Sequence, residues 1–144
     1  LEEKGAIVTL TRPDDSGPSM TERKKILLDA DVDILISIHN NAGGSPNVPM
    51  GTSTYYKHIV NRDLAKILLD HMLELEVRNY GLTGNFNFSL NAPTEYPNAL
   101  VECLFMSSLP DEEKLADPAY LNKIAQKVAD GLEDYLKTVR KSLK

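Results

Sequence analysis

The sequence predicts an α/β fold in which helices flank a mixed, largely parallel β-sheet. Short apolar runs rich in β-branched residues, at 6–10, 34–38 and 99–105, are typical of buried strands. Stretches with the apolar spacing of amphipathic helices lie between and after these runs. Strands that alternate with helices form sheets that are mostly parallel. Ligands bind at the carboxyl ends of such strands, so the polar residues there are the first candidates for a functional site.

Composition sets the broad class of protein. A chain of 144 residues, with 42% apolar and 26% charged residues, has the size and balance of one globular domain, and we expect a single domain over 1–144. The net charge of −5 disfavours a protein whose task is to bind nucleic acid. No apolar run approaches the roughly 20 residues that span a bilayer. The single cysteine, Cys103, excludes a cysteine-rich zinc site.

The first thirty residues predict a strand and a helix. Residues 1–5 resemble the last turn of a helix with its C-terminal glycine. The run AIVTL at 6–10 predicts a buried strand, and the Pro, Asp and Gly residues of 11–18 predict a loop. Ser19 and Glu22 have the spacing of a capping box, so we expect a helix from there to about residue 30.

The middle of the chain alternates in the same way. A second strand at 34–38 ends in a polar, glycine-bearing turn, and TSTYY at 52–56 predicts a third strand at an edge of the sheet. Apolar residues at three- and four-residue steps after Asp63 predict a helix. Residues 79–97 show no clear period and predict a long loop, and long loops in compact domains are often functional.

The last part predicts a further buried strand at 99–105 and a long helix. Pro118 suits the first helical position, and an apolar stripe follows it along the rest of the chain.

Two polar residues stand out against these strands. His39 directly follows the 34–38 strand, where a neutral imidazole can bind a metal or act as acid or base; alternatively it hydrogen-bonds a loop. Glu102 interrupts an apolar strand, and a buried unpaired carboxylate is costly, so we expect it to be paired, metal-associated or accessible. A carboxylate in that position is a candidate general base for metal-bound water, unless strand alternation points it to solvent.

Other polar and aromatic residues are weaker candidates. His58 and His71 are more typical of surface or packing histidines than of ligands. One aromatic set could line a groove or belong to the core: Tyr55, Tyr56, Phe86 and Phe88. An ion-pair network could tie the first loop to the first helix: Arg12, Asp15 and Arg23.

Taken together, these segments resemble the zinc-dependent N-acetylmuramoyl-L-alanine amidases, which cut bacterial peptidoglycan between N-acetylmuramic acid and L-alanine. The matching stretches are TRPDD at 11–15, SMTER at 19–23, DILISIHNNA at 33–42, GTSTYY at 51–56 and PNALVECLFM at 97–106. The resemblance implies that His39 is a zinc ligand and Glu102 the catalytic glutamate. We also take Asn41 as a candidate substrate contact.

The resemblance also implies Zn²⁺ as cofactor, peptidoglycan as partner, and a location in the cell envelope (periplasm) or outside the cell. The family holds zinc through three protein ligands, two of which precede the TRPDD stretch. We therefore expect residues 1–144 to be an N-terminally incomplete amidase-like catalytic domain that lacks the first strand of the sheet. A missing segment or a second chain would then complete the zinc site.

Three functions remain open at this point. The first is zinc-dependent hydrolysis of the muramoyl–alanine amide bond. The second is an inactive amidase-derived fragment that binds peptidoglycan or a partner protein, with the 79–97 loop as its contact. The third is a different hydrolase that combines His39 and Glu102 with His58 or His71.

Overall fold

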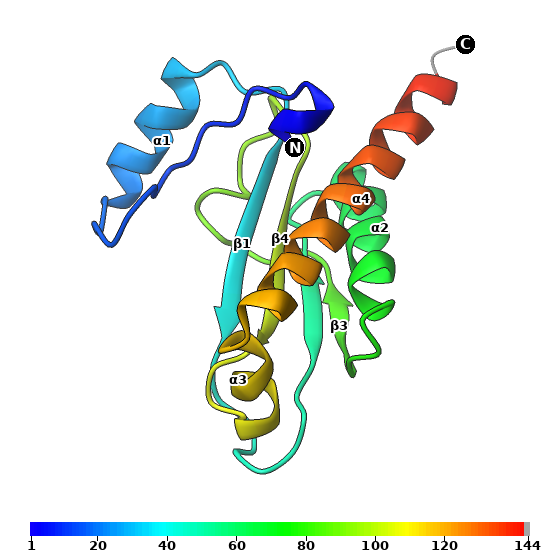
Figure 1. The fold of residues 1–144 in the computed structure, drawn as a ribbon. Coiled ribbons are helices and arrows are strands. Elements are labelled where there is room, and N and C mark those ends of the chain that lie inside the picture. Colours follow the sequence, from blue (N-terminus) through cyan, green and yellow to red (C-terminus); the bar gives the residue numbers. More distant parts are fainter. Residues whose placement is uncertain (143–144) are drawn as a thin grey trace.

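The computed structural model describes residues 1–142, which form a four-stranded sheet with helices on both faces (Figure 1). The strands are β1 (Leu35–Asn41), β2 (Thr52–Tyr55), β3 (Asn79–Thr83) and β4 (Asn98–Phe105), and they lie in the order β1-β4-β2-β3. β1 pairs with β4 in parallel, as β2 does with β3, whereas β4 and β2 are antiparallel. The α/β fold with a mixed, largely parallel sheet is confirmed.

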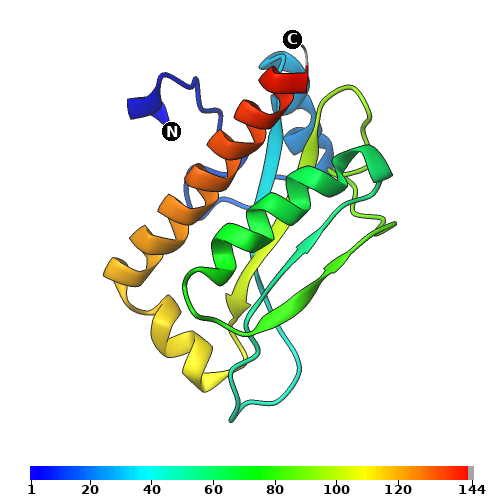
Figure 2. The same cartoon turned by 90° about the vertical axis from the view of Figure 1, so that its right-hand side faces the viewer.

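The helices divide between the two faces of this sheet. They are α1 (Met20–Asp29), α2 (Arg62–Leu73), α3 (Leu109–Leu115) and α4 (Pro118–Ser142), with single 3₁₀ turns at Glu2–Lys4 and Ile59–Asn61. α2 and α4 lie together over one face, whereas α1 lies on the other (Figures 1 and 2). Within the described part of the chain, none of these helices has the length and apolar character that crossing a membrane requires.

Strand alternation explains this division. Ala99, Val101 and Cys103 of β4 point to the face that α2 and α4 cover, and they join the main core. That core also contains buried residues from both helices: Leu64, Ala65, Leu68, Met72, Ile124 and Val128. On the opposite face Leu35 packs with Leu27 of α1 and with Leu90 in a much smaller cluster. The second face therefore stays more open.

The signals at the helix ends are confirmed. The N–H of Glu22 donates to the Ser19 hydroxyl oxygen (3.3 Å), and the Ser19 N–H donates to the Glu22 carboxylate (2.7 Å), which completes the capping box. Gly5 ends the first 3₁₀ turn in the left-handed conformation, with a φ of 86°. Pro118 is the first residue of α4.

The predicted strand at 6–10 is wrong. These residues are extended but pair with none of the four strands, and in Figure 1 they run away from β1 toward α1. The side chain of Ile7 is 99% exposed and that of Leu10 is 62% exposed. A strand needs a neighbour for its backbone N–H and C=O groups, and β1 pairs only with β4 within residues 1–142.

Three further elements differ from expectation. β2 is not at an edge, because β3 pairs with its outer side. β3 was predicted as loop; its five residues include Gly81 and are at most half-buried, so they carry no apolar alternation. α3 has only two turns and was also missed; Ser108 is its N-cap residue, and Pro110 lies in its first turn.

A buried carboxylate holds the sheet ends together. Asp111 of α3 is fully buried, and its Oδ2 accepts from the backbone N–H groups of Gly51 (2.9 Å), Met50 (3.2 Å) and Phe105 (3.2 Å). Gly51 has a φ of 89°, and a Cβ there would lie 1.9 Å from the Arg78 carbonyl oxygen. Only glycine suits this position, where the start of β3 approaches β2.

Candidate active site

The site is built around one row of residues across the central strands. His39 of β1 is the register partner of Glu102 of β4, and Ser53 of β2 is the partner of Glu102 on its other side. Residues paired in this way point to the same face. Because Val101 and Cys103 face the helical core, this row faces the opposite, more open side of the sheet. His39 and Glu102 lie near the carboxyl ends of their parallel strands, as ligand-binding residues do in such sheets.

Glu102 is a half-buried carboxylate with a free oxygen. Its Oε2 is buried and has no hydrogen-bond partner among the described residues. Burial raises the pKa of this carboxyl above its usual range. Its backbone carbonyl accepts from the Thr52 hydroxyl (3.0 Å), which fixes β4 against β2 at this point. A carboxylate with a raised pKa and a free oxygen suits a general base.

His39 lies inside β1 rather than beyond its end, since β1 continues to Asn41. His39 is exposed, but partial removal of its ring from water lowers the pKa of its imidazole, and the positive charge of Arg23 lowers it further. At neutral pH the ring is therefore uncharged and has a lone pair to offer to a metal ion. This is the form of histidine that metal sites use.

Arg23 lies near enough to His39 for its charge to lower the pKa of the imidazole, whereas the sequence placed it in a different network. It was expected in a network with Arg12 and Asp15, but among residues 1–142 it makes no ion pair, and its Nε donates to the Pro18 carbonyl (3.0 Å). Arg12 and Asp15 make a 3.9 Å contact alone, with Asp15 fully exposed. α1 thus brings the Arg23 charge close enough to influence His39. The position of α1 in the fold brings Arg23 near His39, and the local sequence does not indicate that proximity.

Asn41 ends β1 beyond a shift in the register between β1 and β4. Its side-chain oxygen accepts from the Ala42 N–H (2.8 Å), and its backbone carbonyl accepts from the Met106 N–H (2.8 Å). The side chain therefore shapes the turn that follows the strand. Its role as a substrate contact stays a prediction.

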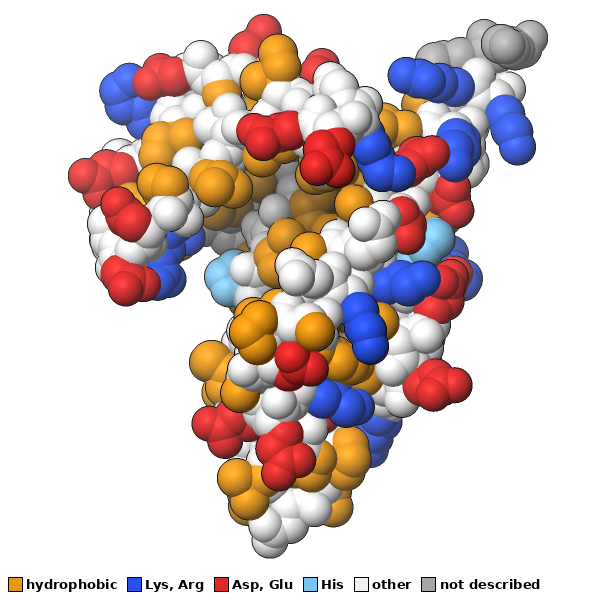
Figure 3. Space-filling view, in the orientation of Figure 1, with side chains coloured by type: hydrophobic (Ala, Val, Ile, Leu, Met, Phe, Trp, Pro, Cys, Tyr) orange, Lys and Arg blue, Asp and Glu red, His pale blue; other side chains and the backbone are white. Residues whose placement is uncertain are grey.

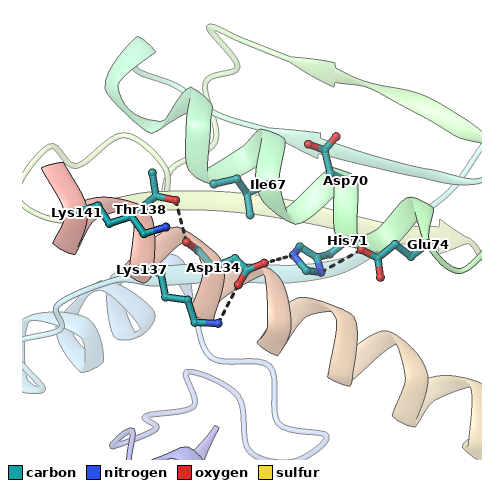
Figure 4. A pocket seen from close by; sticks show the side chains of 8 residues that line it. All are labelled: Ile67, Asp70, His71, Glu74, Asp134, Lys137, Thr138 and Lys141. Atoms are coloured by element: carbon teal, nitrogen blue, oxygen red, sulfur yellow. Dashed lines mark hydrogen bonds and ion pairs between the residues drawn. The ribbon is translucent and has the colours of Figure 1, made fainter.

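The other two histidines lie away from the row. His71 sits between α2 and α4, with Nε2 3.1 Å from Asp134 Oδ2 and Nδ1 3.5 Å from Glu74 Oε1 (Figure 4). It lines a surface pocket of about 430 Å³ on the helical side of the molecule. His58 Nε2 lies 2.9 Å from the Ala92 carbonyl oxygen. Both are surface or packing residues, so the hydrolase built on them has no geometric support.

The described residues do not make a complete zinc site. A catalytic zinc ion needs three protein ligands. Within residues 1–142 no three His, Cys, Asp or Glu side chains lie close enough to hold a metal ion together. Cys103 is no substitute, since burial and the nearby Glu102 charge raise the pKa of its thiol to about 12. Within residues 1–142, the side chain that pairs in register with Glu102 and has the chemistry of a zinc ligand is His39.

Aromatic side chains flank the row on the β2 side. Tyr55 follows Ser53 by two residues and so shares its face, and the hydroxyl groups of the two residues are 3.2 Å apart. The Tyr55 ring packs edge-to-face on Phe86 (5.0 Å between centroids) and on Phe88 (5.9 Å). The predicted loop thus brings its aromatic residues to the same side of the sheet as Glu102.

Comparison with known proteins agrees with this geometry. A sequence profile for N-acetylmuramoyl-L-alanine amidases matches residues 1–134. The chain belongs to this amidase family. It is 30% identical to the N-acetylmuramoyl-L-alanine amidase LytC of Bacillus subtilis over 139 residues, a match that covers 94% of the chain and 28% of LytC. This amidase chain thus spans less than a third of that relative's length.

Solved structures of amidases share the fold. The catalytic domain of CwlV from Paenibacillus polymyxa superimposes with a TM-score of 0.81 at 30% identity, covering 91% of this chain and 73% of that domain. The CwlD amidase from Clostridioides difficile, solved in complex with the GerS lipoprotein, superimposes with a TM-score of 0.87 at 25% identity. The match covers 95% of this chain and 79% of CwlD. The amidase AmiC2 of Nostoc punctiforme superimposes with a TM-score of 0.85 at 27% identity, and the match covers 94% of this chain and 76% of AmiC2.

Proposed function

We propose that this chain hydrolyses the amide bond between N-acetylmuramic acid and L-alanine in peptidoglycan, in a zinc-dependent reaction centred on Glu102 and His39. The observation that carries the proposal is their pairing in register across β1 and β4, with Glu102 Oε2 left without a hydrogen-bond partner among residues 1–142. The family match supports the reaction class. It also supports an extracytoplasmic location, in the periplasm or outside the cell.

Glu102 performs the proton transfers in this proposal. Its carboxylate takes a proton from the attacking water as the water oxygen bonds to the amide carbon. It then gives that proton to the alanine nitrogen as the C–N bond breaks. The products are a lactyl carboxylate on the sugar and a peptide with a free amino terminus. Burial raises the pKa of Glu102, which brings its basicity closer to the working pH.

The remaining zinc ligands must come from outside residues 1–142, because His39 alone cannot hold the ion and these residues contain no cluster of three ligand side chains. One side of β1 carries no strand within residues 1–142, and His39 lies on β1. A strand that pairs there would place its side chains next to His39 on the same face. A further segment or a second chain at this edge would thus complete the site.

A second candidate function is a non-catalytic module that binds peptidoglycan or a partner protein. The observation in its favour is the same lack of a three-ligand cluster within residues 1–142. In this alternative His39 and Glu102 are remnants of a site, and the aromatic loop would make the contacts.

The two functions are distinguished by products. The protein, in the longest form that its gene encodes, is incubated with peptidoglycan fragments with added zinc or with a chelator. Mass spectrometry should detect free peptides that begin with L-alanine, and chelator should abolish them. Retention on insoluble cell wall without released peptide, at every zinc concentration, would instead favour the binding module.

A separate measurement tests the incomplete zinc site. The 144-residue chain, dialysed against a weak chelator, should retain less than about 0.1 zinc per chain, because one histidine binds zinc weakly. Close to one retained zinc, lost in His39→Ala, would show that this chain supplies all of the ligands.

A further inference from the structure

We propose that Tyr55, Phe86 and Phe88 form an aromatic platform that binds the glycan part of the substrate beside Glu102. This inference rests on the proposed function and adds the substrate part that these residues contact. The three rings form one contiguous surface, since Phe86 and Phe88 lie 4.6 Å apart with a 36° tilt, and Tyr55 meets both edge-on. The Phe86 side chain is 40% exposed in a loop, where an aromatic ring gains little from folding alone.

The position of the platform links it to the reacting groups. Ser53 lies directly across from Glu102, and Tyr55 is two residues further along the same face of β2. Strand geometry places the Cα of Tyr55 roughly 8 Å from that of Glu102, a separation that the glycan and the scissile amide of one substrate can span. Since His39 lies on the other side of Glu102, a substrate whose amide lies over Glu102 can extend across Ser53 onto the aromatic rings.

The loop is held in place rather than loosely attached. The Phe86 N–H donates to the Tyr56 carbonyl (3.2 Å), and Lys57 Nζ donates to the Asn87 side-chain oxygen (3.1 Å). Gly84 packs so closely on Tyr56 that a Cβ there would lie 2.5 Å from the ring. Because these contacts fix the loop before a ligand arrives, little conformational entropy of the loop is lost on binding.

The chemistry of the platform favours a sugar over the stem peptide. A pyranose ring has one largely apolar C–H face that stacks on aromatic rings, and hydroxyl groups at its rim. The platform offers flat rings with the Tyr55 hydroxyl and the Asn87 amide at its edge. The three rings carry no charge and so offer no ion pair to the carboxylates of a peptide, and the charged Lys57 lies at the edge of the platform, where it donates to Asn87.

The test measures binding without catalysis. The chain is titrated in a nuclear magnetic resonance experiment, free of zinc, with a four-sugar glycan strand stripped of peptides or with the free stem peptide. Phe86→Leu removes a platform ring and keeps an apolar side chain. Tyr80→Leu is the matched control, since Tyr80 is also exposed (46%) but packs on Phe105, outside the platform.

We expect the glycan to shift the Phe86 and Phe88 ring signals, and Phe86→Leu to weaken glycan binding at least fivefold. Tyr80→Leu should change it less than twofold, and peptide binding should be equal in all three proteins. The inference is overturned if the unaltered chain does not bind the glycan at millimolar concentration, or if Phe86→Leu weakens only peptide binding. Failure of the proposed hydrolysis would appear in the product assay and leave this titration unaffected.

Discussion

The two sides of β1 differ sharply in how they are packed. On one side of β1 the sheet continues through β4, β2 and β3. Over this part of the sheet α2 and α4 form the main core, in which Leu64, Leu68 and Met72 of α2 are completely buried. On the other side β1 has no neighbouring strand within the described residues, and Ile38 is 59% exposed. Figure 3 shows a hollow lined by apolar side chains between the N-terminal part and the body of the molecule. From this contrast we expect the helical core to supply most of the stability of the fold and residues 6–10 to supply little.

An apolar groove marks the boundary between the two regions. It has a volume of about 200 Å³ and lies between the strands and α4, with Ile38 and Cys103 on one wall and Ile124 and Val128 on the other. Exposed apolar surface beside an unpaired strand edge is typical of a site that another strand covers. This is the edge at which we propose that the zinc site is completed.

The largest expected difference between the regions is in hydrogen exchange. Amides of β4, which pair on both sides, should exchange only through global unfolding, whereas those of residues 6–10 should exchange almost freely. The protection factors should differ by more than about 10⁴ at neutral pH, given global stabilities of about 5–15 kcal/mol. Equal protection of the two segments, measured by mass spectrometry or nuclear magnetic resonance, would remove the contrast.

A pair of core and edge substitutions sharpens the comparison. Leu68→Ala leaves a cavity in the fully buried α2–sheet interface and should lower the free energy of unfolding by about 2–5 kcal/mol. The control Ile7→Ala, at a side chain that is 99% exposed, should change it by less than about 0.5 kcal/mol. Urea denaturation measures both. A cost at Ile7 close to that at Leu68 would mean that residues 6–10 are packed in solution.

The smallest expected effect concerns Glu102, because partial burial of its charged carboxylate lowers the free energy of unfolding. The pKa of Glu102 is raised in the folded chain, so the folded state binds the proton more tightly than the unfolded chain does. The free energy of unfolding therefore falls as the pH rises from the unfolded-state pKa through the folded-state pKa of this carboxyl. Glu102→Gln removes that cost and should raise Tm by about 1–3 °C at pH 7. Below about pH 3, where the carboxyl is protonated in both the folded and the unfolded state, the difference should vanish. A lower Tm for Glu102→Gln at pH 7 would show that the carboxylate is paired.

The sequence predicted the elements that carry a strong apolar period. β1, β4, α2 and α4 follow from their spacing, because burial against a neighbour imposes that spacing. Residues 6–10 have an equally strand-like sequence, but no strand among the described residues pairs with them. A local sequence pattern does not show whether a pairing strand is present. β3 was missed for the opposite reason, since it pairs through its backbone while its side chains stay partly exposed.

The candidate site divides in the same way. His39 and Glu102 were proposed as site residues because each is a polar residue next to or within an apolar strand, and the structure pairs them in register. Ser53 and Arg23 were not assigned to this place, since only strand register and the path of α1 bring them near the pair. The aromatic contact between Tyr55 and Phe86 depends on a loop closure that no short motif indicates.

The most direct measurement of the central claim separates the two proposed roles. Zinc content and release of L-alanine-terminated peptide are measured for the protein in its longest natural form and for Glu102→Gln and His39→Ala. Glu102→Gln should keep its zinc and lose at least about 100-fold in rate, because only the proton transfer is removed. His39→Ala should lose zinc and activity together. Hydrolysis that survives Glu102→Gln, or zinc content unchanged in His39→Ala, would contradict the account.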